Sequence, residues 1–293
     1  MDRILLNSTA LFLFIILSTL KLQAQDLPPL SGYSEINEKI GYTDIKIEYS
    51  RPSARGRKIF GDLVSLGRIW RAGANEDTKI TFSTDVEINN ETLKKGSYSI
   101  FIKPKEKSCV FYFYQKSTTD WGGVPPKNSK EQHAWNPEKL KLEFEVPIKQ
   151  VEYTETLTFG IQNISLSRGE LFMAWEEIKI AVPFTTKSTG QAIKSIEKRL
   201  QEPTPWQYYD YANFYMGNSI KLKEALKYIN IAINKAENSS WWFLRCKSQI
   251  LAKLKRYDEA IETAKEGLKE AKKEKSNFYT TQSNNDIKRW INI

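Results

Sequence analysis

Residues 51–76 contain the densest group of side chains that can bind a ligand. The group surrounds Trp70 and consists of Arg51, Arg55, Arg57, Arg68, Arg71, Asn75 and Glu76. Because guanidinium groups present a planar fork of donors to carboxylate, phosphate or sulfate, this composition predicts a site for an anionic ligand or a sugar. The alternative is internal bracing, in which Arg71 pairs with Glu76 or Asp77 and ties a long connection to its domain.

A second candidate site lies in residues 116–138, a connection too long for an ordinary hairpin. It carries Trp121, His133 and Trp135. Exposed indole rings on such loops stack against the apolar faces of sugar rings, so Trp121 and Trp135 are candidates for contact with a glycan. The alternative is that both rings fold back and cover the edge of a sheet.

The same sequence argues against several kinds of enzyme. His133 is the only histidine, so the chain has no histidine pair for zinc, and only His133 is available for a histidine-based triad. No phosphate-binding glycine loop or dinucleotide fingerprint occurs. We therefore predict no catalytic residue, no metal site and no cofactor. One enzymatic alternative stays open, an envelope glycan hydrolase whose carboxylate pair cannot be chosen from the spacing of Asp and Glu.

The elements that position these residues are predicted to be strands between residues 42 and 183. Apolar and charged side chains alternate along 44–49 and 139–146, and further strand-like runs cover 79–83, 97–103, 109–115, 156–162 and 171–182. Asn89-Asn90 and Lys95-Gly96 lie where hairpins must turn. The pattern predicts an antiparallel all-β sandwich or barrel-like domain within an α+β multidomain protein.

The period changes after Pro183, where a stretch of Thr, Ser and Gly at 185–190 is expected to link the sheet to five or six amphipathic helices. Residues 222–236 align with residues 257–271 at an offset of 35 residues. This offset resembles helical repeats of the tetratricopeptide type. The resemblance implies a groove for an extended protein segment, lined by Gln207, Asp210, Phe214, Trp242, Arg245 and Gln249.

Trp242 is the expected anchor of that groove. The alternative is core packing, because Trp241 and Trp242 are adjacent and one of the two rings must face inward.

Residues 1–24 have the layout of a secretory signal. Arg3 is followed by an apolar run from Ala10 to Leu17, and Ala24 precedes the expected cleavage point. The run is shorter than the roughly 20 residues that a spanning helix needs. We therefore expect an exported protein, periplasmic or secreted, soluble after cleavage near Ala24 and without a membrane span. The expected organisation is a signal peptide at 1–24, a β-sandwich domain at 25–184 and a helical-repeat domain at 185–293.

Basic charge gathers in the C-terminal part of the chain. Residues 25–183 hold 22 basic and 22 acidic residues, whereas residues 184–293 hold 20 basic and 12 acidic residues, a net charge of +8. In an exported protein this charge favours an acidic protein, an acidic polysaccharide or lipid head groups as the partner over nucleic acid, although a solvated lysine-rich helix surface has the same composition.

Cys109 and Cys246 fall in different predicted domains, so we expect two unpaired, buried thiols.

Residues 49–61 (YSRPSARGRKIFG) and 68–76 (RIWRAGANE) resemble a family of exported bacterial proteins that is classified as a domain of unknown function, numbered 2911. The resemblance covers about residues 31–184 and implies no activity, cofactor or catalytic residue. Together these observations predict an exported, non-catalytic binding or scaffolding protein. Its helical repeats are expected to engage a protein partner, and its β-domain a glycan or an anionic ligand.

Overall fold

The structure is a computed structural model of the 293-residue chain, and it describes residues 28–115, 137–199, 203–236 and 241–293. The strands are β1 (Gly32–Ile40), β2 (Thr43–Arg51), β3 (Thr78–Phe82), β4 (Val86–Ile88), β5 (Glu91–Leu93), β6 (Gly96–Pro104), β7 (Ser108–Tyr114), β8 (Leu140–Gln162) and β9 (Arg168–Thr186). A short 3-10 helix, η2 (Pro137–Lys139), precedes β8. The α-helices are α2 (Ser188–Lys198), α3 (Pro205–Gly217), α4 (Leu222–Lys235), α5 (Trp241–Lys253), α6 (Tyr257–Lys273) and α7 (Asn277–Ile291). This order of elements confirms the α+β class.

The strands of the described segments form one antiparallel sheet with the order β1-β2-β3-β6-β7-β8-β9-β4-β5. The alternation predicted for 44–49 is confirmed, because Ile45, Ile47 and Tyr49 are buried and the side chains between them reach the surface. The period-two pattern does not predict β1. Only Ile40 of this strand is buried, as expected of an edge strand that faces water along most of its length.

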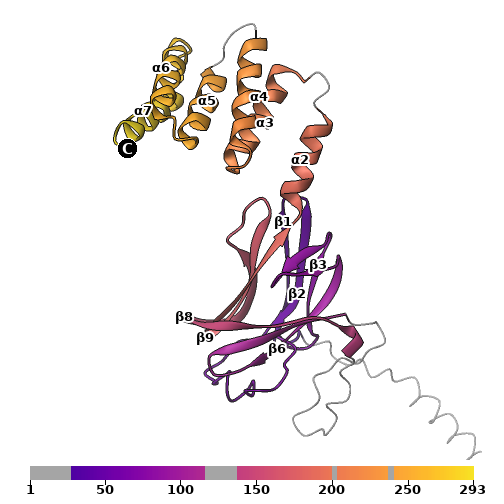
Figure 1. Cartoon of the computed structure of the whole chain (residues 1–293). Coiled ribbons are helices and arrows are strands. Elements are labelled where there is room, and N and C mark those ends of the chain that lie inside the picture. Colours follow the sequence, from indigo (N-terminus) through magenta and orange to yellow (C-terminus); the bar gives the residue numbers. More distant parts are fainter. Residues whose placement is uncertain (1–27, 116–136, 200–202, 237–240) are drawn as a thin grey trace, which may run out of the picture.

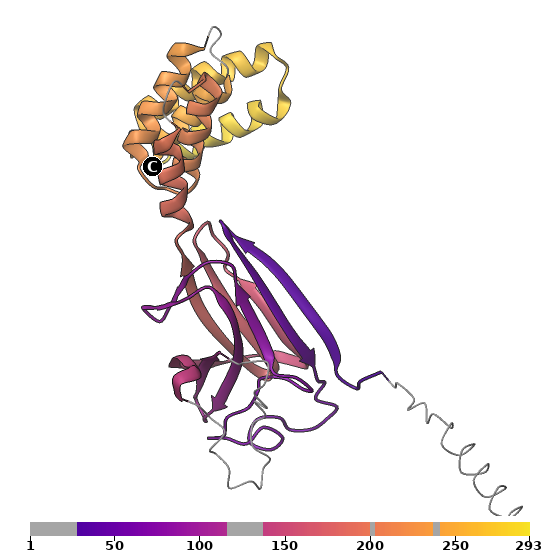
Figure 2. The ribbon, with the colours of Figure 1, turned by 90° about the vertical axis from the view of Figure 1, so that its right-hand side faces the viewer.

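β8 and β9 fold the sheet onto itself. β8 pairs with β7 as far as Pro147 and with β9 from Ile148 onward. The register between β8 and β9 shifts on either side of Thr154, opposite Glu176, whose φ is 51°. Irregularities of this kind bend a strand and increase its twist. The two halves of the sheet therefore face each other around one apolar core, as a sandwich requires (Figures 1 and 2).

Of the two predicted hairpin turns, only that at Asn89-Asn90 is confirmed. Lys95-Gly96 joins β5 to β6, which are not neighbours in the sheet because β6 pairs with β3 and β7, so the hairpin predicted there is wrong. Asn89 and Asn90 join β4 to β5 with φ angles of 50° and 64°, which a two-residue hairpin turn requires. Before Gly96, the Asp85 carboxylate accepts a hydrogen bond of 2.9 Å from Lys95 N and pairs with Lys94 Nζ at 3.2 Å. These donors, the backbone N–H first, lower the pKa of Asp85.

The joint between the sheet and the helices differs from the prediction. The expected linker at 185–190 consists instead of the end of β9 and the first turn of α2. Ser188 is only 1% exposed, and its Oγ accepts a hydrogen bond of 3.0 Å from Tyr42 N and donates to Ile40 O at 3.3 Å. A direct joint satisfies the polar groups of this buried backbone, which a loose linker would leave unpaired. Figure 1 shows α2 rising from the β1–β2 end of the sheet.

The two segments aligned at an offset of 35 residues form α4 and α6, and each packs against the helix before it. Small residues allow this approach, since Ala225 and Ala260 are fully buried and a Cβ on Gly267 would lie 3.1 Å from Leu244 Cβ. One apolar cluster forms around Ile229 and a second around Trp290. No helix in the described segments has the length and apolar character needed to span a membrane.

Candidate functional site

Apart from Arg51, the last residue of β2, the predicted arginine cluster lies on the connection from β2 to β3, residues 52–77. Near its start, Leu157 N donates to Pro52 O at 2.9 Å. In its second half, Trp70 and Ile102 exchange backbone hydrogen bonds of 2.7 and 2.9 Å. These bonds fix a long irregular segment to both halves of the sheet, so its side chains have a defined direction.

Two carboxylates from β8 and β9 fasten the same connection. The Glu176 carboxylate accepts hydrogen bonds from Ile59 N at 2.9 Å and from Phe60 N at 3.2 Å. Glu155 Oε1 accepts a hydrogen bond of 2.8 Å from Arg55 N. Hydrogen bonds between carboxylates and backbone N–H groups are among the stronger ones in proteins. Both carboxylates therefore act in the architecture of the connection.

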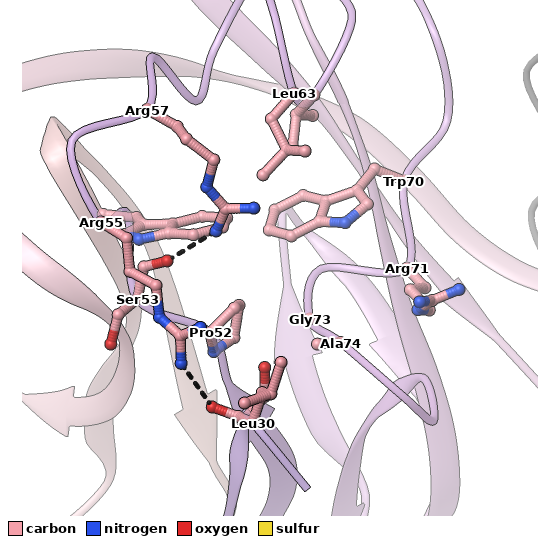
Figure 3. Close-up of a pocket in the computed structure, with 13 residues that line it drawn as sticks. Leu30, Pro52, Ser53, Arg55, Arg57, Leu63, Trp70, Arg71, Gly73 and Ala74 are labelled. Atoms are coloured by element: carbon pink, nitrogen blue, oxygen red, sulfur yellow. Dashed lines mark hydrogen bonds between the residues drawn. The ribbon is translucent and has the colours of Figure 1, made fainter.

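A pocket of about 320 Å³ lies within this connection (Figure 3). Arg55, Arg57 and Arg71 contribute to its lining, as do the rings of Trp70 and Trp175. The rest of the lining is small or apolar, and it contains no Asp, Glu or His within the described part of the chain. The volume is at the lower end of the range for ligand pockets, so it suits a small ligand.

Arg57 is held in place at the edge of the pocket. Its Nε donates to Ala54 O at 2.9 Å and its Nη2 donates to Ser53 O at 2.8 Å. Arg55 Nη2 donates to Leu30 O at 3.1 Å. Figure 3 shows these two guanidinium groups on one side of the pocket, with Arg71 on the opposite side and directed away from them. The cationic part of the pocket is therefore formed by Arg55 and Arg57.

The aromatic wall is a stack of two tryptophans. Trp70 and Trp175 have ring centroids 5.6 Å apart and planes inclined by 23°, and Phe60 meets both rings edge-on. Trp175 is 1% exposed, and its Nε1 donates to Glu155 O at 3.2 Å. This buried support fixes Trp70, which remains partly exposed, as a rigid face of the pocket.

The other members of the cluster lie elsewhere. Arg51 braces β2 against β8, because its Nε and Nη2 donate to Leu157 O and Thr158 Oγ1, each at 3.3 Å. Asn75 Nδ2 donates to Ser50 Oγ at 3.1 Å and to Ser31 O at 3.3 Å. Internal bracing, the alternative for the whole cluster, is therefore correct for these two residues.

Arg68 and Glu76 do not contribute to the lining of the pocket. Among the described residues, Arg71 forms no ion pair with Glu76 or with Asp77, and the buried Asp77 accepts a hydrogen bond from Ser99 Oγ. The pairing of Arg71 that the bracing alternative named is therefore not found among the described residues. The loop candidates Trp121 and Trp135, together with His133, lie outside the described residues.

Sequence reasoning missed Trp175, Glu155 and Glu176. Trp175 lies at an inward position of the alternating run 171–182, so the alternation indicates burial without indicating a pocket. No local sequence pattern distinguishes the two glutamates from other carboxylates on the strands. Their partners are about 100 or more residues away along the chain, and only the fold brings them together.

The candidates on α5 lie where this helix meets α7. Trp241 is buried and Trp242 is 37% exposed, so the inward ring is that of Trp241. The Trp242 ring lies 4.7 Å from that of Tyr279 on α7. Arg245 Nη2 lies 3.5 Å from the buried Asp286 Oδ2, and its guanidinium lies 5.8 Å from the Tyr279 ring centroid. α7 therefore covers part of the face on which Arg245 lies.

The remaining groove candidates differ in their surroundings. Gln249 contacts Arg245 and Asp286. Gln207 completes a capping box, in which its side chain accepts from Thr204 N at 2.8 Å. On the same helix, Asp210 is exposed and Phe214 is partly buried against Tyr215, with ring centroids 5.8 Å apart.

No group of three or more His, Cys, Asp or Glu suited to a metal ion occurs among the described residues.

A family model described as "Protein of unknown function (DUF2911)" matches residues 31–184, which include every strand of the sheet except the last two residues of β9. The chain belongs to this family. No curated protein and no solved structure matches the chain.

Proposed function

We propose that this protein is an exported, non-catalytic binding protein that holds a small anionic ligand in the pocket of its sheet domain. The observation that carries the proposal is the lining of the pocket. Two guanidinium groups line it, that of Arg57 beside the Trp70 ring and that of Arg55 near Leu30, and the described lining has no acidic side chain. Such a wall attracts an anion, and no described carboxylate in the lining repels it.

The alternative of a glycan hydrolase gains no support from this pocket. Hydrolysis of a glycosidic bond uses two carboxyl groups on opposite sides of that bond. The described lining provides none, and the nearby Glu155 and Glu176 accept hydrogen bonds from the backbone. Carboxylates committed in this way are poor candidates for the acid and the nucleophile.

A second part of the proposal is that the helices engage a protein partner. The repeat pattern favours this use, and residues 184–293 have a net charge of +8. Aromatic side chains remain at the surface at the N-terminal ends of α3, α5 and α7, where Trp206, Trp242 and Phe278 are 54%, 37% and 64% exposed. Exposed aromatic rings of this kind are common anchors in protein interfaces.

Binding and product release, measured on the same samples, test the non-catalytic role. We expect the chain from residue 25 onward to bind acidic oligosaccharides in titration calorimetry and to release no product detectable by mass spectrometry. Replacing both Arg55 and Arg57 with Gln should weaken binding about tenfold or more, since hydrogen bonds to charged groups are lost. Arg168→Gln is the matched control, because this exposed arginine lies outside the pocket. Release of product by the unmodified chain would favour the hydrolase.

A further inference from the structure

Donors without partners surround the pocket. Arg57 uses Nε and Nη2 to bond the backbone, and its Nη1 forms no hydrogen bond with the described chain. Gly73 and Ala74 also line the pocket, and their backbone N–H groups donate no hydrogen bond within the same segments. Gly73 is buried, and a buried backbone N–H is nearly always paired in a folded protein. These donors indicate a ligand that accepts hydrogen bonds.

The walls beside these donors are apolar. Trp70, supported by its stack with Trp175, faces the space next to the Arg57 guanidinium, and Leu63 and Pro52 lie around it (Figure 3). Trp70 Nε1 has no hydrogen-bond partner in the described chain. A partly exposed indole with a free N–H suits a ring whose face is apolar and whose edge carries hydroxyl groups.

The small number of remaining donors favours a ligand that carries a single negative charge. Leu30 O, Ser53 O and Ala54 O already take hydrogen bonds from Arg55 and Arg57, so only some of their N–H groups remain for a ligand. No helix of the described chain contributes a residue to the lining, so the positive end of a helix dipole is also absent there. A doubly charged phosphate would need more of these donors than a carboxylate does.

We infer that the pocket binds a sugar acid of monosaccharide size, whose carboxylate contacts Arg57 and whose ring lies against Trp70. This inference rests on the proposed function and narrows its ligand. The same ring can be a free monosaccharide or the terminal residue of an acidic glycan, and the volume of about 320 Å³ accommodates one such ring.

Three probes that share one ring test the inference on the chain from residue 25 onward. D-glucuronate carries a carboxylate, D-glucose is neutral and D-glucose 6-phosphate carries a phosphate. We expect D-glucuronate to bind at least tenfold more tightly than the other two in titration calorimetry, with quenching of tryptophan fluorescence. Arg57→Gln should remove this preference, and Arg57→Lys should restore part of it, because lysine keeps the charge without the fork. Arg168→Gln should change neither.

An oligosaccharide that ends in glucuronate separates the two sources of the ring. Binding of the oligosaccharide at least as tightly as the monosaccharide supports a glycan end, and binding of the monosaccharide alone supports a free sugar acid. Tighter binding of D-glucose 6-phosphate overturns the sugar-acid inference and leaves the proposed binding of an anion standing. Equal binding of all three probes overturns both, because the neutral sugar would then bind as tightly as the anions. If neither of the charged monosaccharides nor the oligosaccharide binds, both the inference and the anionic-ligand proposal fail.

Discussion

At the scale of single residues, the backbone decides which arginines reach the pocket. Arg55 and Gly56 have φ angles of 53° and 71°, so two successive left-handed residues turn the chain sharply. The turn brings the Arg57 guanidinium back onto the carbonyl groups of Ser53 and Ala54, beside Trp70. Arg51, which lies on the regular strand before this turn, braces β8 instead. Identical side chains thus have different roles because the chain changes direction between them.

The two cysteines allow a prediction at the same scale. Both thiols are buried and unpaired, and burial raises the pKa of Cys109 and of Cys246 to about 12. At pH 8 we expect iodoacetamide to label the folded chain on the order of a thousandfold more slowly than the unfolded chain, since only the thiolate reacts. Mass spectrometry of unreduced, unfolded protein should find both thiols labelled.

The same shift predicts a dependence of stability on pH. The folded state keeps both thiols protonated, so their contribution to the free energy of unfolding is complete below the unfolded pKa of about 8.5. It should decrease as the pH rises from there toward 12. Rapid labelling of either cysteine in the folded protein at pH 8 would show that its thiol is open to solvent.

At the scale of elements, the joint between β9 and α2 fixes where the helices begin. Gly41, in the β1–β2 turn, has a φ of 58°, and a Cβ on it would overlap Ser188 and the carbonyl oxygen of Leu166. Ser167 and Thr189 also meet across the joint through their hydroxyl groups, which are 2.5 Å apart. The expected boundary between residues 184 and 185 falls inside β9, whose last residues pair with β4.

We expect Gly41→Ala to lower the free energy of unfolding by about 2 to 4 kcal/mol, the sum of left-handed strain and overpacking. Gly67→Ala is the matched control. Gly67 has a φ of 71°, but no atom lies within 4 Å of its added Cβ, so only the strain of about 1 kcal/mol applies. Thermal unfolding followed by circular dichroism compares the two variants. An equal loss in both would mean that the joint is not tightly packed.

At the scale of the whole molecule, each of the four apolar clusters among the described residues belongs either to the sheet domain or to the helices. Two lie in the sheet domain and two hold the helices together, and the basic charge of the chain belongs to the helical part. α7 covers α5 through Tyr279 and Asp286, which contact Trp242 and Arg245. This arrangement leaves part of Trp242 at the surface and commits Arg245 to an internal contact. Of the two residues, Trp242 is therefore the better candidate for an anchor.

We expect Trp242→Ala to weaken capture of a protein partner from the exported fraction about thirtyfold, as the loss of about 2 kcal/mol at an interface anchor implies. Replacement of the exposed Lys265 should mainly alter the salt dependence of capture. Tyr33→Ala is the control, because it removes an exposed aromatic side chain from β1 and so tests whether any loss of apolar surface weakens capture. A Trp242→Ala protein with an unchanged circular dichroism spectrum and full capture would show that Trp242 is not the anchor.

Local patterns in the sequence determined most of the fold. Period-two alternation predicted the inner strands, because adjacent side chains on a strand must point to opposite faces. Asn89-Asn90 predicted a hairpin turn, because few residues adopt the backbone angles of such a turn. β1 escaped prediction because an edge strand buries little. The ordered joint at 185–190 also escaped prediction, because Ser188 is held by Ile40 and Tyr42, which are far away along the chain.

The sequence also placed arginines and a tryptophan near one another, and the family match agrees with that segment. Only the tertiary structure selected Arg55 and Arg57 for the pocket, added Trp175 behind Trp70 and assigned Glu155 and Glu176 to the backbone. The physical reason is the separation along the chain between the residues that interact. Alternation and turn chemistry act between neighbours in the chain, whereas the pocket depends on where β8 bends and on contacts across about 100 or more residues, which no local pattern encodes.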